Sequence, residues 1–385
     1  MPQILMRENF VSFVLSMSIL YTCELLPVFA TNASKTNQSN ATILTSDRSS
    51  IPQVSNITAK IAIQPQFDDA QNFSEGLAAV KIGEKWGYID KSGKIICQPQ
   101  FEIANDFSDG MALVKRDNKY GYINRNGQLA IEPQFPWAFD FSEGWAAVQI
   151  GDKWGYIDKR GHVVIKPDYE QTWEFSEGLA AVLVNEKTAY INKQGKIALH
   201  SQFGGSFGFS EGLAPAFDED KEKWGYINKQ GRIVIQPQFD HAAKFSEGLA
   251  GIFIYQAESN SQQNSSGWLT GILKDRLHGY VNKQGKVVIP PQFDIATDFS
   301  EGMAVVRSKA NRFGYVNKTG IAIQPQFNWA GRFSEGLAPV EVNKKFGYIN
   351  KTGKIVIPIQ YDTADYFSNG LARVKSGNKW GYISK

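Results

Sequence analysis

Acidic residues recur along the chain at a spacing that could support chemistry. An acid follows a Phe-Ser pair in eight places and asparagine stands in the ninth: Glu75, Asp109, Glu143, Glu177, Glu211, Glu247, Glu301, Glu335 and Asn369. Paired carboxylates can transfer protons or hold a cation. A reaction centre is normally unique, so an acid copied eight times indicates a structural role. We expect each acid to accept hydrogen bonds from turn amides or to face a lysine of its own hairpin, an exposed contact worth about 0.2–1 kcal/mol; a cation ladder is the alternative.

The other chemically active residues form no known constellation. The four histidines occupy four different positions of the repeat, without metal-ligand spacing: His162, His200, His241 and His278. The run Asp218-Glu219-Asp220 lacks the alternating ligands and glycine of a calcium loop. There is no phosphate-binding glycine loop and no nucleophile elbow. We therefore predict no catalytic, cofactor-binding or metal site, and expect that the protein is not an enzyme.

Composition excludes several classes of protein. The chain has 385 residues, of which 42% are apolar, enough for a packed core and too many for a wholly disordered chain. Its net charge is only +3, from 41 basic and 38 acidic residues, with no basic block. A dedicated nucleic-acid binder needs clustered Lys and Arg, so we expect no nucleic-acid partner. The two cysteines, Cys23 and Cys97, exclude a disulfide framework.

A repeat dominates the chain. The string Phe-Ser-x-Gly begins at nine positions: Phe73, Phe107, Phe141, Phe175, Phe209, Phe245, Phe299, Phe333 and Phe367. Six of the eight intervals are 34 residues, one is 36 and one is 54. Self-similarity at such a period is typical of a solenoid, a propeller or a related array. We therefore predict one repeat array over residues 58–385, with an insertion at about 256–272.

The unit that begins near Lys60 predicts three strands. Apolar or alternating residues mark strands at 61–63, 77–82 and 85–90, and a turn of the Asp-x-x-Gly type closes the unit at 90–93. Phe67, Ala70 and Phe73 recur at intervals of three, which predicts one tight helical turn between the first two strands. The fold class is therefore all-β, with about nine three-stranded repeats.

An aromatic-glycine dipeptide lies in the third strand of the unit. The Trp-Gly form stands at 86–87, 154–155, 224–225 and 380–381, and Thr188-Ala189 breaks the pattern in the fourth unit. Together with Phe-Ser-Glu-Gly-Leu-Ala upstream and Pro-Gln-Phe downstream, it resembles the WG repeat family of bacterial β-repeat proteins over about residues 60–385. The resemblance implies a β-rich, repetitive and often exported protein. It offers no catalytic residue that could be transferred to this chain.

The dipeptides are predicted to be structural. A large aromatic ring buries about 150–250 Å², and a small unit needs such rings to close its core, whereas glycine leaves room for a neighbouring backbone. We assign this role to Trp86, Gly87, Trp154, Gly155, Trp224, Gly225, Trp380 and Gly381. The alternative is a row of exposed rings that stack on sugars. Cys97 falls where other units have isoleucine, which predicts a core thiol.

Two residues are candidates for an interaction surface. Between the repeated Ala and Val of the second strand, the chain carries Pro215, Pro339 and Arg373. Proline and arginine at this position predict a solvent-facing side and an amide that no ladder needs, which makes Arg373 a candidate. Trp268 is the second candidate, because it lies in the polar insertion, and insertions often map to a binding face. The alternative for the insertion is a tolerated surface loop.

Two architectures fit nine such units. In an open curved solenoid, each unit contacts only its neighbours. In a closed, propeller-like ring, the strand at 60–64 would complete a sheet with the last pair, 371–375 and 379–383. Propellers usually have four to eight blades of four strands, and 34 residues is short for such a blade. The open array is therefore the expectation, and the closed ring is the alternative.

The N-terminus predicts export. Arg7 precedes an uncharged, mostly apolar run at 10–22, which is too short to span a bilayer and fits a signal peptide of residues 1–30 cleaved after Ala30. An uncleaved anchor and a lipoprotein acylated at Cys23 are the alternatives. Residues 31–57 are rich in Thr, Asn, Ser and Gln, which predicts a disordered tether. We expect a secreted or periplasmic protein with no transmembrane segment in its mature chain.

These features favour an exported binding or scaffold module. Its partner would be an unknown protein or a cell-envelope glycan, held by a repeated surface. One alternative is a glycan-acting enzyme with two carboxylates, for which Asp218, Asp220 and Glu258 are the acids outside the repeat. Another alternative is a passive structural spacer.

Overall fold

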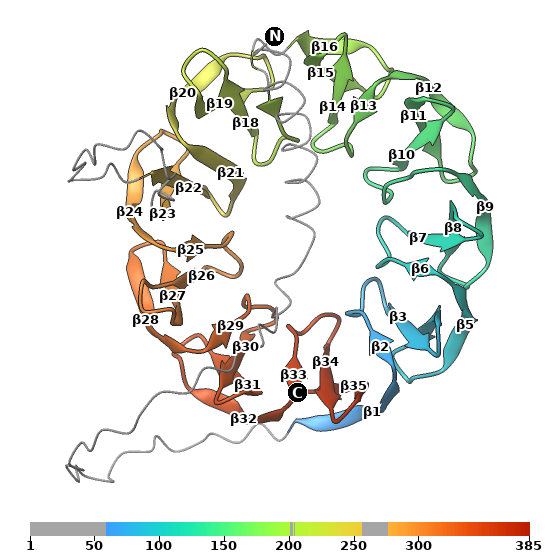
Figure 1. Ribbon diagram of the computed structural model, residues 1–385, viewed down its shortest axis with the longest axis vertical. Helices are drawn as coiled ribbons and strands as arrows, with labels where there is room; N and C mark the ends of the chain where they lie inside the picture. Colours follow the sequence, from blue (N-terminus) through green and yellow to red (C-terminus); the bar gives the residue numbers. More distant parts are fainter. Residues whose placement is uncertain (1–58, 201–202, 204, 256–275) are drawn as a thin grey trace, which may run out of the picture. The chain divides into compact units, whose positions relative to one another are not determined.

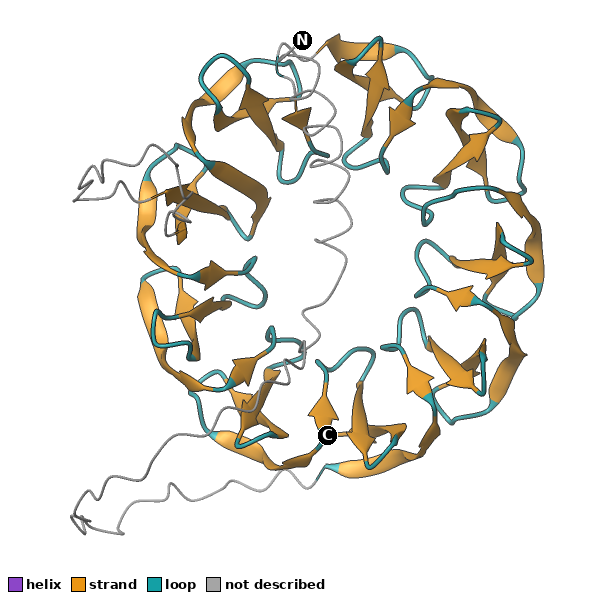
Figure 2. Ribbon diagram, viewed as in Figure 1, coloured by secondary structure: helices purple, strands orange, loops and turns teal. Residues whose placement is uncertain are grey.

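The computed structural model describes residues 59–200, 203, 205–255 and 276–385, where every regular element is a β-strand (Figure 2). Within these ranges no helix is long and apolar enough to cross a membrane. The predicted signal peptide, the tether and the insertion with Trp268 and Glu258 lie outside the described residues. The repeats form one compact unit from Val54 to Lys385.

Each repeat builds a small antiparallel sheet, or blade. The first blade has the order β2 (Asp69–Ala70), β3 (Leu77–Ile82), β4 (Lys85–Asp90) and β5 (Ile95–Phe101). The predicted helical turn is therefore wrong, because these residues are extended and form a fourth strand. The amide of Gln71 donates to the carbonyl of Ala79 at 2.8 Å, and Ala70 pairs with Val80. The three-stranded repeat is corrected to a four-stranded blade whose inner strand has only two residues.

The other blades repeat this order. Blades two to four contain β6 (Ile103–Ala104), β7 (Met111–Arg116), β8 (Lys119–Asn124), β9 (Leu129–Phe135), β10 (Trp145–Ile150), β11 (Lys153–Asp158), β12 (Val163–Tyr169), β13 (Gln171–Thr172), β14 (Leu179–Val184), β15 (Lys187–Asn192) and β16 (Ile197–His200). Blades five and six contain β17 (Gly205–Ser206), β18 (Leu213–Asp218), β19 (Lys223–Asn228), β20 (Ile233–Phe239), β21 (His241–Ser246), β22 (Leu249–Tyr255), β23 (Arg276–Asn282) and β24 (Val287–Phe293). Blades seven and eight contain β25 (Ile295–Ala296), β26 (Ala304–Arg307), β27 (Phe313–Asn317), β28 (Gly320–Phe327), β29 (Trp329–Ala330), β30 (Leu337–Val342), β31 (Lys345–Asn350) and β32 (Ile355–Tyr361). In the third blade an isolated bridge between Ala138 and Val148 replaces the inner strand.

The ninth blade closes the ring. It contains β33 (Thr363–Ala364), β34 (Leu371–Ser376) and β35 (Lys379–Ser384), and its outer strand is β1 (Lys60–Phe67) from the other end of the repeats. Lys60 pairs with Ser384 and Phe67 with Trp380, so the unit is a nine-bladed propeller (Figure 1). The closed ring named as the alternative is confirmed, and the open solenoid is not what forms. A two-residue inner strand explains how 34 residues suffice for a blade, and closure removes the exposed strand edges of an open array.

One tyrosine per blade holds neighbouring blades together. It stands two residues after the dipeptide aromatic, and each copy is at most 1% exposed. Its hydroxyl donates to a backbone carbonyl of the next blade, as Tyr88 does to Asn105 at 2.8 Å and Tyr382 to Gln71 at 2.7 Å. Its ring packs on the phenylalanine of the next Phe-Ser-x-Gly loop, and the Tyr88 and Phe107 centroids are 5.3 Å apart. Both contacts recur at Tyr122, Tyr156, Tyr190, Tyr226, Tyr280, Tyr315 and Tyr348.

The dipeptide residues lie beside these tyrosines. Trp154, Trp224 and Trp380 are 8–9% exposed, and Trp86 is half-buried. A Cβ on Gly87 would lie 2.5 Å from the carbonyl oxygen of Cys97, because the outer strand bulges against the third strand at this point. The same close approach occurs at Gly155, Gly225 and Gly381. Any residue other than glycine would therefore displace the outer strand. The thiol of Cys97 is buried, 3% exposed, in the core beneath it.

The second strand is buried on both sides. Ala79, Pro215, Pro339 and Arg373, at the position predicted to face solvent, are all buried. This side packs into the interface with the neighbouring blade, as Ala79 does in the cluster around Phe107. The carbonyl of Pro339 still accepts a hydrogen bond from Gly331 at 2.9 Å. Proline is tolerated because the short inner strand uses the carbonyl, which proline retains.

The fourth blade departs from the shared geometry. Ala189 pairs directly with His200, and Tyr190 with Leu199, so the irregularity that precedes the tyrosine in the first blade is absent, while the one that follows it remains between Tyr190 and Ile191. The close backbone approach seen at Gly87, where a Cβ would lie 2.5 Å from the Cys97 carbonyl oxygen, is incompatible with the Cβ of Ala189. The fourth blade also lacks the aromatic ring of the dipeptide, since Thr188 stands in its place.

We predict a local minimum of stability around Thr188–Gly208. Loss of a large core ring typically costs about 3–5 kcal/mol, and in a repeat protein a weak unit divides cooperativity. Hydrogen exchange on the mature protein should show lower protection in this segment than in Trp154–Ile165 or Trp224–Ile235. Equal protection in the three segments would show that the fourth blade has adapted fully.

Candidate functional site

The repeated acids lie in tight hairpins between the inner and second strands. In the first blade Ser74 bridges to Leu77, and the two residues between them, Glu75 and Gly76, have φ values of 52° and 89°. Left-handed values at both central residues define a type I′ hairpin turn. Glycine adopts them freely, whereas the acid does so at a cost of about 1–2 kcal/mol. The turn positions the acid to contact the next blade.

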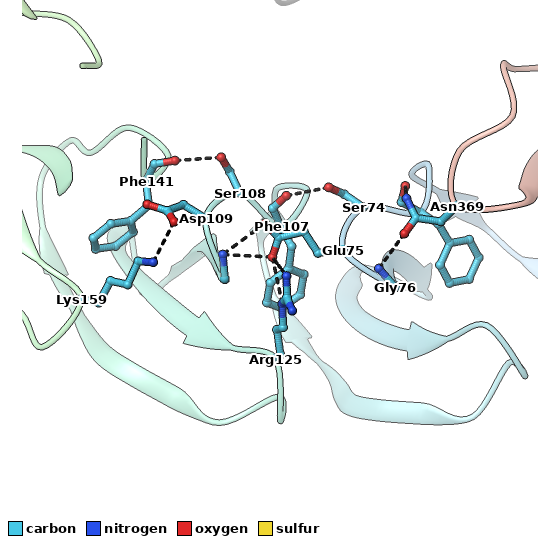
Figure 3. A network of polar contacts seen from close by, with 12 residues as sticks. Ser74, Glu75, Gly76, Phe107, Ser108, Asp109, Arg125, Phe141, Lys159 and Asn369 are labelled. Carbon is cyan, nitrogen blue, oxygen red and sulfur yellow. Dashed lines mark hydrogen bonds and ion pairs between the residues drawn. The ribbon is translucent and has the colours of Figure 1, made fainter. Parts of the chain in front are cut away.

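Each acid joins two blades. The carboxylate of Glu75 accepts a hydrogen bond from the Gly110 amide at 2.9 Å and pairs with Arg125 at 2.5 Å, both in the second blade (Figure 3). The hydroxyl of Ser74 donates to the carbonyl of Phe107 at 2.6 Å. We call this set of contacts the loop ladder. The expectation that acids cap turn amides holds, but the amide and the cation belong to the next blade rather than to the acid's own hairpin.

The loop ladder runs around the whole ring. The acid-to-glycine-amide bond recurs at Asp109, Glu143, Glu177, Glu211, Glu247, Glu301 and Glu335. The serine-to-carbonyl bond recurs at Ser108, Ser142, Ser176, Ser210, Ser246, Ser300, Ser334 and Ser368. Asn369 completes the circle, because its side-chain oxygen accepts from the Gly76 amide at 3.0 Å. The repeated acids thus support the fold.

The surroundings of three loop-ladder acids, Asp109, Glu211 and Glu301, favour their ionised form. Burial alone would raise the pKa of Glu211, but hydrogen bonds from Lys283 and from the Gly248 amide outweigh it and lower that pKa below its ordinary value of 4.5. The pKa values of Asp109 and Glu301 are lowered in the same way. A lowered pKa makes these groups poor proton donors near neutral pH.

A second set of side chains lies along the inner side of the ring. The inner strands face the centre of the ring (Figure 1), and one residue links each of them to the Phe-Ser-x-Gly loop. We call these nine linking residues the inner rim: Asn72, Asp106, Asp140, Glu174, Gly208, Lys244, Asp298, Arg332 and Tyr366. Five charged members are exposed: Asp106, Glu174, Lys244, Asp298 and Arg332. Unlike the framework residues, they differ from blade to blade.

Inner-rim residues interact with neighbouring blades. The amide of Asn105 donates to Asp140 at 3.2 Å, and the guanidinium of Arg332 lies 3.8 Å from the ring centroid of Tyr366. Partial loss of hydration near the neighbouring blades raises the pKa of Glu174, although part of its side chain is exposed, and repulsion from Asp140 raises it further. Desolvation likewise raises the pKa of Asp140 and Asp298. Among the described residues, no three of the acids, histidines and cysteines converge to hold a metal ion.

The two predicted interaction residues have different outcomes. Trp268 lies outside the described residues. The structure places Arg373 in the interior, 8% exposed, rather than on the surface. Its guanidinium pairs with Asp365 at 2.7 Å and donates to the carbonyl of Ala70 in the first blade. Arg373 therefore joins the closing blade to the first blade. The inner rim was not identified from the sequence. Charged residues that vary from blade to blade at one fixed position of the repeat could have indicated it.

Two histidines from different repeat positions come together in the sixth blade. His241 stacks on Phe253 with centroids 5.0 Å apart, and His278 packs on the same ring at 5.2 Å. Burial lowers the pKa of both imidazoles to about 4, so both are neutral at pH 7. They contribute to an aromatic cluster.

The comparisons agree with this geometry. The family model described as "WG containing repeat" matches the chain in nine segments: 54–86, 86–120, 120–154, 154–187, 189–221, 224–254, 279–310, 313–346 and 346–380. The protein therefore belongs to the WG containing repeat family. Within that family, this member is a closed nine-bladed propeller. No curated protein matches its sequence.

Solved structures resemble the fold at low sequence identity. A eukaryotic initiation factor is 12% identical, with a TM-score of 0.53, and the match covers 86% of this chain and 91% of that one. Dihydro-heme d1 dehydrogenase is 10% identical, with a TM-score of 0.42, over 80% and 76% of the two chains. The extracellular domain of a hybrid two-component system from B. thetaiotaomicron is 8% identical, with a TM-score of 0.33, over 82% and 52%. The first of these similarities concerns the fold alone.

The inner rim and the loop ladder predict opposite effects of pH. The pKa of Asp140 is raised in the folded protein, so ionisation of this carboxyl destabilises the fold. The destabilisation is absent when the pH is below the ordinary pKa of 3.8, and it is complete when the pH is above the raised pKa of the folded state. Asp140→Asn should therefore raise the free energy of unfolding at pH 7, with the gain fading as the pH is lowered toward 3.8. Urea unfolding at several pH values measures this.

Glu211→Gln is the matched comparison. The lowered pKa of Glu211 contributes stability above its ordinary value of 4.5, which is lost as the pH falls through the folded pKa. This substitution should cost about 1 kcal/mol at pH 7 and progressively less in acid. If both substitutions changed stability with the same sign at pH 7, the assignment of the two acid sets would be contradicted.

Proposed function

We propose that the protein is an exported, non-enzymatic binding module that presents the propeller surface to a glycan or protein of the cell envelope. The observation that carries the proposal is the contrast between framework and inner rim. Tyrosines, serines and the acid or Asn369 of the turn make the same contact in every blade, whereas the inner-rim position is acidic, basic or uncharged depending on the blade and is exposed at its five charged members named above. Function is normally located in residues placed on a constant scaffold in this way.

Several features support binding as the activity. The repeated carboxylates are engaged by glycine amides and cations, so the framework leaves them no free role in proton transfer. The exposed rim charges come from different blades of one closed frame and can act together. Several weak contacts made simultaneously give useful affinity without a deep pocket. Export is expected from the sequence of residues 1–30.

Co-sedimentation with insoluble cell-wall glycan and with envelope extract tests the proposal. Because β1 and β35 close the ring, deletion of repeats would unfold it, so the test uses substitutions at exposed positions. One variant neutralises five rim charges: Asp106→Asn, Glu174→Gln, Lys244→Gln, Asp298→Asn and Arg332→Gln. A control variant neutralises five exposed charges of the same signs away from the rim: Glu84, Lys85, Lys94, Glu219 and Asp220.

We expect the wild type and the control variant to co-sediment, and the rim variant to lose at least tenfold in affinity. The loss follows from the removal of several charge-assisted contacts at once. Circular dichroism should show the same fold for all three proteins. Equal binding by the rim and control variants, or no binding by the wild type to either material, would refute the proposal.

A further inference from the structure

Several blades contain a carboxylate-binding arrangement that the protein fills with its own aspartate. Asp68, just after the outer strand β1, accepts a hydrogen bond from the Gly83 amide at 2.8 Å and pairs with Lys379 at 2.6 Å. We call the lysine and the turn amide the carboxylate seat. It recurs with Asp362 between Gly377 and Lys345, and with Asp240 between Tyr255 and Lys223. Three internal copies thus define the geometry in which this fold holds a carboxylate.

The third blade has the seat but not the acid. Pro136 stands at the position of Asp68, while Lys119 and Gly151 stand where Lys379 and Gly83 stand. The turn is the same, because Gly151 has a φ of 63° and Gly83 a φ of 62°. In the part of the chain that the structure describes, neither the Lys119 ammonium nor the Gly151 amide makes a hydrogen bond or ion pair. Both donors are therefore available to a carboxylate from outside.

Pro136 also alters the backbone. The amide of Asp68 donates to the carbonyl of Lys81 at 2.9 Å, and its counterparts in other blades make the same bond. Proline has no N–H, so the third blade lacks this bond, and only the bridge between Ala138 and Val148 remains of its inner strand. One substitution thus removes both the internal carboxylate and part of the inner ladder.

A groove opens at this site between the second and third blades. Its volume is about 390 Å³, and its lining includes Lys119, Gln134, Pro136, Gln149, Ile150 and Gly151. Trp137, the residue after Pro136, is 58% exposed and stacks on Tyr120 with centroids 5.9 Å apart. A cation, an amide donor and two side-chain amides therefore line the groove, and the exposed ring of Trp137 follows the lining residue Pro136 in the sequence. Large aromatic side chains exposed beside a groove are typical of contact sites.

We propose that this groove binds a carboxylated sugar residue of an acidic polysaccharide. The carboxylate lies between Lys119 and the Gly151 amide, as the Asp68 carboxylate lies between Lys379 and Gly83. The apolar face of the sugar ring packs on Trp137, and Gln134 and Gln149 are placed to bond hydroxyl groups. The inference rests on the proposed function and names the ligand class for one part of its surface.

A sugar fits the groove better than an acidic peptide does. The groove is open and shallow and offers no deep apolar pocket for a side chain to anchor a peptide. The Trp137 ring, supported by Tyr120, is a rigid flat surface, and the C–H face of a pyranose is its natural complement. An acidic peptide remains a distinct outcome of the test.

Calorimetry with hexagalacturonate, its methyl ester and hexaglutamate tests the proposal on the mature protein. The key variant is Pro136→Asp, which restores the internal acid and should occupy the seat without loss of thermal stability. Lys119→Gln and Trp137→Ala remove the cation and the ring. Lys345→Gln is the matched control, because Lys345 lies in a seat already filled by Asp362.

We expect hexagalacturonate to bind the wild type and the Lys345 control, and the other three variants to bind at least about tenfold more weakly. Tenfold is the loss expected from one charge-assisted contact. The methyl ester should bind the wild type at least about tenfold more weakly than the acid does, because it lacks the carboxylate. Undiminished binding by Pro136→Asp, equal binding of acid and ester, tighter binding of hexaglutamate, or no binding to the wild type would overturn the groove assignment. The broader function would still stand if envelope glycan co-sedimented and the rim variant did not.

Discussion

A buried tyrosine hydroxyl that donates to a carbonyl of the next blade is the interaction on which this ring depends. Each blade is too small to enclose a core of its own. Each buried tyrosine ring therefore packs on a phenylalanine ring of the neighbouring blade. A carbonyl left without its donor in such an interface costs about 1–3 kcal/mol. The contact between Tyr382 and Gln71 makes the last interface equivalent to the others, so the array closes instead of ending in two exposed edges.

Closure determines which residues remain for function. The serines, acids and tyrosines that recur in every blade are engaged in contacts between blades, so their chemistry serves stability. Specificity is left to positions where the blades differ. These are the inner rim, with its exposed charges, and the third blade, where Pro136 frees a lysine and an amide that other blades satisfy internally. Both proposed binding surfaces therefore use positions outside the contacts that the blades share.

Much of the architecture could be predicted from the sequence, because the same pattern recurs in nine repeats. A residue that is atypical in one repeat is therefore outweighed by its counterparts in the others. The repeat, its family and its third strand follow from the Phe-Ser-x-Gly and Trp-Gly strings. The two-residue inner strand could not be found, because Phe67, Ala70 and Phe73 fit a helical turn as well as an extended segment. For another reason, the closure could be named only as an alternative to the open array, and the partners of Glu75 were missed. They join residues 35 to about 310 positions apart, for which a single sequence holds no spacing signal.

The most direct test compares two tyrosine-to-phenylalanine substitutions. Tyr382→Phe removes the hydroxyl bond to Gln71 across the closure, and Tyr122→Phe removes the bond to Phe139 between two consecutive blades. Urea unfolding of each variant against the wild type gives the change in the free energy of unfolding. The closed ring predicts that both changes are about 1–3 kcal/mol and similar to each other. A neutral Tyr382→Phe beside a destabilising Tyr122→Phe would contradict closure and with it the central role of this contact.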